Sequence, residues 1–136
     1  MGTIPNRLEP LPEKVQESTV TNPQKIKGSA FERIIVTFLR AWGFLVDRTR
    51  AGWVDDRGDV HGITHPRLGA FTVECKNHKT MALAGWMEEL NREIAANGGG
   101  LGAVVHKRKG VTDPALQYAT LPLGMLVQLL KEAGYE

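Results

Sequence analysis

The sequence is poor in cysteine, with a single one, Cys75, among its 136 residues. No disulfide can therefore form within the chain, which argues against a small secreted domain held together by disulfides. The sequence also lacks any apolar run of the length that a membrane-spanning helix or a signal-peptide core requires. Internal repeats and low-complexity segments are absent as well. We therefore expect an intracellular, cytoplasmic protein.

The composition is that of an ordinary globular protein, with 42% hydrophobic and 24% charged residues. The formal net charge of +2 permits a nucleic-acid partner without establishing one. Residues 1–26 contain four of the chain's seven prolines among scattered charges and show no hydrophobic period. We predict a flexible N-terminal arm over residues 1–26 and a single folded domain over residues 27–136.

Hydrophobic periodicity predicts three helices and five strands. Apolar residues recur at helical spacing from Ser29 to Gly43, from Leu83 to Ile94, and from about Leu121 to Gly134. In the third helix the residues predicted to face inward are Leu123, Leu126, Val127 and Leu130. The predicted strands span residues 44–46, 59–63, 69–76, 101–106 and 116–119. This order indicates a mixed sheet flanked by helices, an α/β or α+β fold.

The predicted strand 69–76 carries the first candidates for chemistry. Side chains alternate between the faces of a strand, so Glu74 and Lys76 project from one face, about 7 Å apart, while Cys75 points into the core. Asp59 lies fifteen residues before Glu74. A hard cation such as Mg²⁺ binds one or two carboxylates and keeps several waters, so Asp59 and Glu74 are candidate metal ligands. Such a metal activates water, and Lys76 would orient the nucleophile or stabilise developing negative charge. The pattern predicts phosphodiester hydrolysis.

The simpler interpretation of Glu74 and Lys76 is a solvated charge pair, which is the commoner role of Glu-x-Lys on a strand. What favours a site is the wider arrangement. The residues Gly58-Asp59-Val60 directly precede the predicted hairpin whose second strand carries the pair.

A zinc-binding module is a further alternative for this region. It would use four potential ligands: His61, His65, Cys75 and His78. Structural zinc sites usually contain two or more cysteines, and Cys75 is expected to lie in the core as a small apolar residue. The zinc interpretation is therefore the weaker one.

Several short motifs occur together in this part of the chain: Lys27-Gly28-Ser29 leading into Phe31-Glu32-Arg33, Trp42-Gly43-Phe44, Arg48, Gly58-Asp59 and Val73-Glu74-Cys75-Lys76. With these motifs, residues 26–109 resemble the archaeal-type Holliday-junction resolvases of the PD-(D/E)XK nuclease superfamily. Gly58 stands where the superfamily name implies a proline.

The resemblance implies a restriction-endonuclease-like fold and a homodimer that cuts four-way DNA junctions symmetrically, in DNA recombination and repair. It also implies Mg²⁺ as the cofactor, with Mn²⁺ as a substitute. The catalytic roles fall on Glu32, Asp59, Glu74 and Lys76. The implied metal ligands are Asp59, Glu74 and the backbone carbonyl of Cys75.

Glu32 also has a structural interpretation. Ser29-x-x-Glu32 matches a capping box, in which Ser29 would cap the helix and Glu32 would reach back to its backbone. Without the resemblance the cap and the catalytic role are evenly balanced, and the resemblance favours catalysis.

Basic residues fall beside the predicted site and would give a surface for phosphates. They are Lys27, Arg48, Arg50, Arg57, Lys79, Lys107, Arg108 and Lys109. For each one alone, a solvated position is the commoner role. Trp53 could stack on an exposed base or lie in a dimer interface.

The substrate stays open at this stage. A repair, flap or restriction nuclease shares the same core, and a DNA-binding protein without cleavage is disfavoured by the intact set of Asp59, Glu74 and Lys76. A junction resolvase needs two active sites related by a two-fold axis, and therefore a dimer. The apolar faces of the second and third predicted helices are the candidate interfaces.

Overall fold

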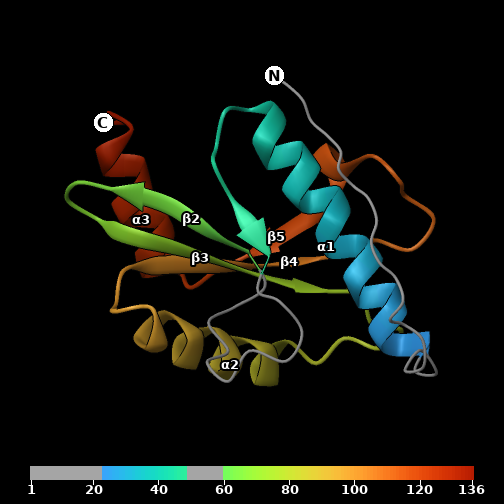
Figure 1. Cartoon of the computed structure of the whole chain (residues 1–136). Helices are drawn as coiled ribbons and strands as arrows, with labels where there is room; N and C mark the ends of the chain where they lie inside the picture. Colours follow the sequence, from blue (N-terminus) through green and yellow to red (C-terminus); the bar gives the residue numbers. More distant parts are fainter. Residues whose placement is uncertain (1–22, 49–59) are drawn as a thin grey trace.

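The computed structural model describes residues 23–48 and 60–136 (Figure 1). In chain order the elements are α1 (Pro23–Ala41), β1 (Asp47–Arg48), β2 (Val60–His65), β3 (Gly69–Lys76), α2 (Leu83–Ala96), β4 (Leu101–His106), the 3-10 helix η3 (Pro114–Leu116), β5 (Tyr118–Thr120) and α3 (Leu123–Glu132). Figure 1 shows α2 below the sheet, α1 above it, and α3 beside the β2–β3 hairpin. The predicted mixed sheet flanked by helices is confirmed. Among residues 23–48 and 60–136, none of the helices has both the length and the hydropathy of a membrane span.

The five strands form one sheet in the order β1-β2-β3-β4-β5. Strands β1, β2 and β3 are antiparallel neighbours, β3 and β4 are parallel, and β5 is antiparallel to β4. A parallel pair needs a crossover connection, which α2 supplies between β3 and β4. Strands β3 and β4 have the predicted bounds. The predicted Glu-x-Lys strand is therefore the central strand of the sheet.

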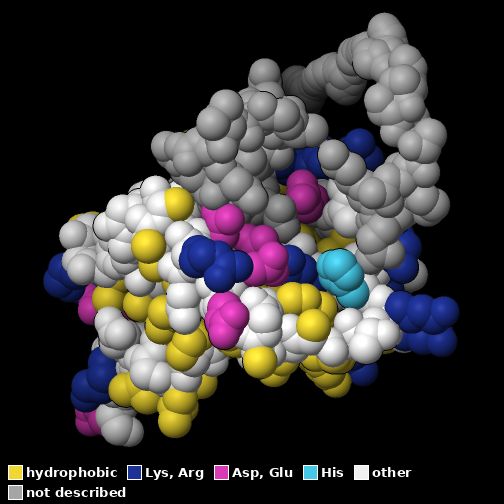
Figure 2. All heavy atoms as spheres, turned by 90° about the horizontal axis from the view of Figure 1, so that it is seen from below, with side chains coloured by type: hydrophobic (Ala, Val, Ile, Leu, Met, Phe, Trp, Pro, Cys, Tyr) yellow, Lys and Arg dark blue, Asp and Glu magenta, His cyan; other side chains and the backbone are white. Residues whose placement is uncertain are grey.

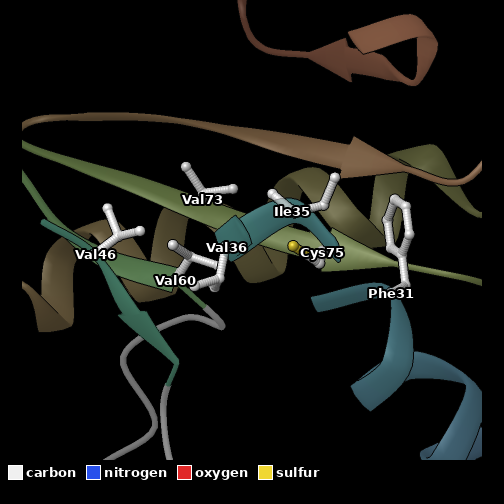
Figure 3. Close-up of a cluster of buried hydrophobic side chains, with 7 residues drawn as sticks. All are labelled: Phe31, Ile35, Val36, Val46, Val60, Val73 and Cys75. Carbon is white, nitrogen blue, oxygen red and sulfur yellow. The ribbon is translucent and has the colours of Figure 1, made fainter. Parts of the chain in front are cut away.

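Two groups of buried side chains hold helices against the two faces of the sheet. Figure 3 shows the first group, in which α1 packs on the sheet through Phe31, Ile35, Val36, Val46, Val60, Val73 and Cys75. The second group joins α2 to the other face and consists of Trp86, Leu90, Ile94 and Val104. Cys75 is thus an apolar core residue, as its alternation with Glu74 predicted.

Helix α2 approaches the sheet closely because β4 carries a glycine where the helix crosses it. A Cβ atom on Gly102 would lie 3.0 Å from Leu90 Cδ1, 3.1 Å from Ile94 Cδ1 and 2.6 Å from the Thr72 carbonyl oxygen. Because Gly102 has no side chain, α2 can pack close to β3 and β4.

Helix α1 begins at Pro23 instead of Ser29. Proline suits the first turn of a helix, where its missing N–H would have no partner within the helix. Ser29 consequently lies inside α1, and the predicted capping box with Glu32 is wrong.

The far end of α1 explains why the predicted strand 44–46 is displaced. Gly43, at φ 95°, donates its amide to the Arg40 carbonyl, and Phe44 donates to the Leu39 carbonyl. This pair of hydrogen bonds closes a helix C-terminus. Because it uses the Phe44 amide, strand pairing begins only at Asp47. Strand β5 is likewise shifted, to Tyr118–Thr120, because η3 occupies Pro114–Leu116.

Helix α3 has the predicted position in the chain, but it faces the other way. The four residues predicted to point inward are exposed, with Leu123 at 72%, and the others are Leu126, Val127 and Leu130. Met125, Leu129 and Glu132 are the partly buried residues of the helix. Glu132 fastens the helix to the β2–β3 hairpin through an ion pair with Arg67 and a contact with His65, whose Nε2 lies 3.5 Å from Glu132 Oε2. An apolar stripe on α3 is thus left uncovered among the described residues.

Candidate active site

Strand β3 carries Glu74 and Lys76 on the face that is turned towards α2, opposite Cys75. Their side chains are only 11% and 13% exposed, and Lys76 Nζ lies 4.0 Å from Glu74 Oε2. A solvated charge pair would be far more exposed. Figure 2 views the molecule from the α2 side and shows acidic and basic side chains gathered in the middle of this face. The structure therefore brings this predicted pair together in a sheltered position.

Glu89 of α2 is a residue of this cluster that the sequence patterns missed. Its Oε1 atom lies 2.6 Å from Lys76 Nζ, which is closer than the Glu74 carboxylate lies to the same ammonium. The only signal in the sequence is its place at the edge of the apolar helix face, between Trp86 and Leu90. That place does not reveal which strand residue it meets.

Asp59 lies outside the described residues, as do Arg50, Arg57 and Trp53. The structure does describe one chain neighbour of Asp59 and one of Glu74, the two predicted metal ligands. Val60, which follows Asp59 in the chain, pairs with Val73, which precedes Glu74.

Glu32 and Arg48 form a second charged cluster, between α1 and β1. Arg48 Nε donates to Glu32 Oε1 at 2.9 Å, and its Nη2 donates to the hydroxyl of Ser29. Ser29 and Glu32 are thus joined through one arginine, and not through a capping box. Both the predicted catalytic Glu32 and the predicted phosphate ligand Arg48 hold a defined position in this cluster.

His106 lies next to Lys76 in the sheet. It pairs with Lys76 in register on one side and with Tyr118 on the other. His106 Nε2 is 2.8 Å from Thr120 Oγ1, and its ring centroid is 5.8 Å from that of Trp86. Burial lowers the pKa of His106 below 6.5, because the charged imidazolium is disfavoured away from water.

The predicted DNA-binding residues within the described ranges lie at the N-terminal part of α1, on β1 and after the ends of β3 and β4. Lys27 and Lys79 are exposed. Lys107 donates its ammonium to the carbonyls of Arg108 and Val111, at 2.7 and 2.6 Å. Arg108 lies over the Tyr118 ring, 4.3 Å from its centroid. The basic side chains therefore differ in how much of their charge is open to a phosphate.

The four proposed zinc ligands do not form a metal site. Cys75 belongs to the core beside α1, whereas His78 lies 5.8 Å from the Trp86 ring. Across residues 23–48 and 60–136, no group of three or more His, Cys, Asp or Glu side chains could hold a metal. Mg²⁺ does not need such a group, because it binds through one or two carboxylates and keeps its waters. The Glu74 carboxylate fits that cation.

The antiparallel strands β1 to β3, the helical crossover to a parallel β4 and the Glu-x-Lys pair on β3 together define a restriction-endonuclease-like α/β protein, the class of the PD-(D/E)XK nucleases. A family model named Mrr_cat and described as a restriction endonuclease matches residues 23–135. The chain belongs to this restriction endonuclease family. No curated protein matches it. The predicted fold is confirmed, and the chain carries a nuclease domain that acts on DNA.

Proposed function

We propose that the protein is a divalent-metal-dependent endodeoxyribonuclease that hydrolyses phosphodiester bonds with Asp59, Glu74 and Lys76, assisted by Glu32. The observation that carries this proposal is the sheltered Glu74–Lys76 pair on the central strand of the family's fold. The pair offers a metal ligand and a cation for the phosphate on one face of one strand.

The proposed cofactor is Mg²⁺, with Mn²⁺ as a substitute, held by Asp59, Glu74 and the backbone carbonyl of Cys75. When bound, such a cation activates a water and offsets the charge of the scissile phosphate. The pairing of Val60 with Val73 supports this ligand set, because consecutive Cα atoms are about 3.8 Å apart and Asp59 and Glu74 each adjoin one member of the pair. Lys76 stabilises the negative charge that develops on the phosphate oxygens.

The proposed DNA surface consists of Lys27, Arg48, Arg50, Arg57, Lys79, Lys107 and Arg108. Exposure favours Lys27 and Lys79 as the sequence-independent phosphate contacts. Arg108 is held by the Tyr118 ring and by its donation to the Leu116 carbonyl at 3.0 Å, so it offers a guanidinium of fixed orientation.

The proposed substrate is a four-way DNA junction, and the proposed active form is a homodimer. The motifs in residues 26–109 that resemble the junction resolvases support this choice. A resolvase needs two active sites related by a two-fold axis. Of the two candidate interfaces, the apolar face of α2 is buried against the sheet, whereas the stripe on α3 is exposed. We therefore place the dimer contact on α3.

The second candidate function is cleavage of linear duplex DNA in the manner of a restriction enzyme. The description of the matching family favours it.

Cleavage of labelled four-way junction, flap, nicked duplex and linear duplex DNA separates the two candidates. Each DNA is incubated with the wild-type protein in Mg²⁺ and in EDTA. Symmetric, Mg²⁺-dependent cuts confined to the junction are the expected result. Preferential cleavage of linear duplex would contradict the junction substrate and support the second candidate function. Cleavage in EDTA would contradict the metal dependence.

A further inference from the structure

The ammonium of Lys76 lies closer to a carboxylate of α2 than to the carboxylate on its own strand, β3. Glu89 Oε1 on α2 lies 2.6 Å from Lys76 Nζ, whereas Glu74 Oε2 on β3 lies 4.0 Å from the same atom. The first distance is that of a charge-assisted hydrogen bond, and the second is at the limit of an ion pair. One ammonium therefore lies between two carboxylates, and that of Glu89 is the closer of these two.

We propose that Glu89 is a positioning residue of the active site, which fixes the ammonium of Lys76 beside Glu74. The inference rests on the proposed function, because it concerns the lysine that would act on the phosphate. A lysine side chain has a flexible four-carbon stem, so its charge has no fixed place unless a partner holds it. A cation that is already in place stabilises developing charge without reorganisation during the reaction.

The position of Glu89 is set by the packing of α2. Trp86 and Leu90, on either side of it in the helix, are buried against the sheet. Gly102 allows that packing to be close, because a side chain there would meet Leu90. Glu89 is consequently carried to Lys76 by a helix whose own contacts do not depend on the ion pair.

The exposure of Glu89 and Lys76 favours a role in the site over a role in folding. Glu89 is 42% exposed, whereas Lys76 is 13% exposed. An ion pair with one partner this open to water contributes little to stability. The bond thus lies at the border between the sheltered pair on β3 and the solvent from which DNA would approach.

The test compares Glu89→Gln with Glu88→Gln, which removes the same charge from the neighbouring exposed residue of α2. Steady-state cleavage of the best DNA substrate is measured in Mg²⁺, together with the melting temperature of each variant. We expect Glu89→Gln to lower kcat by about 10- to 100-fold, with KM nearly unchanged, since misplaced catalytic groups cost rate in this range. Glu88→Gln should match the wild type, and all melting temperatures should agree closely.

A double-mutant cycle shows whether Glu89 acts through the lysine. In a Lys76→Met background the Glu89→Gln change should produce no further loss, because the group that it positions is gone. If the double variant loses kcat by the product of the two single losses, the positioning role is overturned. A Glu89→Gln variant as active as the wild type would also overturn it. If the wild-type protein cleaves none of the DNAs, the proposed function fails and the inference fails with it, whereas wild-type cleavage with an unaffected Glu89→Gln variant overturns the inference alone.

Discussion

Gly102 of β4 lies directly against Leu90 of α2, and an added Cβ atom would lie 3.0 Å from the leucine side chain. The same atom would lie 2.6 Å from the Thr72 carbonyl oxygen on the neighbouring strand, and backbone there cannot easily move. This contact links the central strands to the helix that carries Glu89. The site thus depends on a residue that has no side chain.

Gly102→Ala should destabilise the protein by about 1–3 kcal/mol, because it overpacks the interface between α2 and the sheet. The measurement is denaturant unfolding. The matched control is Gly85→Ala on the exposed face of α2, where nothing lies within 4 Å of the added atom. That change should stabilise the helix by about 0.5–1 kcal/mol. A Gly102→Ala variant as stable as the wild type would show that α2 is not held at this distance.

Glu74→Gln should lower DNA cleavage by about 100-fold or more, because it removes a proposed metal ligand while keeping the shape of the side chain. Asp59→Asn should have the same effect. Both variants should bind DNA at least as tightly as the wild type, since less negative charge would face the phosphates. Cleavage and gel-shift assays on one DNA measure the two properties. Cleavage that survives either substitution would place the active site elsewhere.

Leu126→Glu should convert the proposed homodimer into a monomer, because it places a charge in the apolar stripe of α3. Light scattering after size-exclusion chromatography gives the mass of each species. Gln128→Glu adds the same charge to an exposed residue of α3 outside the stripe and should leave the dimer intact. A wild-type monomer at all concentrations would rule out α3 as a self-interface.

His106 should make the stability depend on pH. Its pKa is lowered by burial in the folded protein and is near 6.5 in the unfolded chain, so below pH 6.5 the unfolded chain binds the proton first. The free energy of unfolding should therefore be greatest above pH 6.5, fall as the pH drops from 6.5 towards the lowered folded pKa, and level off below it.

His106→Gln should remove this component, because glutamine can still bond to Thr120 Oγ1 but does not titrate. Denaturant unfolding of both proteins is measured at about pH 7.5 and about pH 5, on either side of the pKa of the unfolded chain. An equal loss of stability in the variant and in the wild type would assign the pH dependence to other groups.

Local periodicity was sufficient to predict the buried strands whose ends are marked in the sequence. Strand 69–76 alternates cleanly between Cys75 and Glu74, and the glycines after α2 mark the start of β4, so both strands were predicted with their bounds. The bounds failed where backbone hydrogen bonds decide them. The amide of Phe44 closes α1, and no apolar pattern reveals this.

The candidate site was predictable only in its local part. Glu74 and Lys76 are two residues apart on one strand, so their common face followed from the alternation. Glu89 was missed because its contact with Lys76 crosses from helix to strand, and its position depends on how closely α2 packs. The stripe on α3 was predicted as a pattern, but its direction was wrong, since periodicity shows that four apolar residues share a face and not what covers that face.

The contacts of Glu132 with Arg67 and His65 give α3 a mechanical role. They fasten the helix to the turn of the hairpin whose second strand carries Glu74. If two copies meet along α3, the β2–β3 hairpin of each copy sets the distance between the two-fold axis and the strand that carries Glu74. The spacing of the two active sites would then fix the offset between the two cuts on opposite DNA strands, whatever the DNA sequence at the cut.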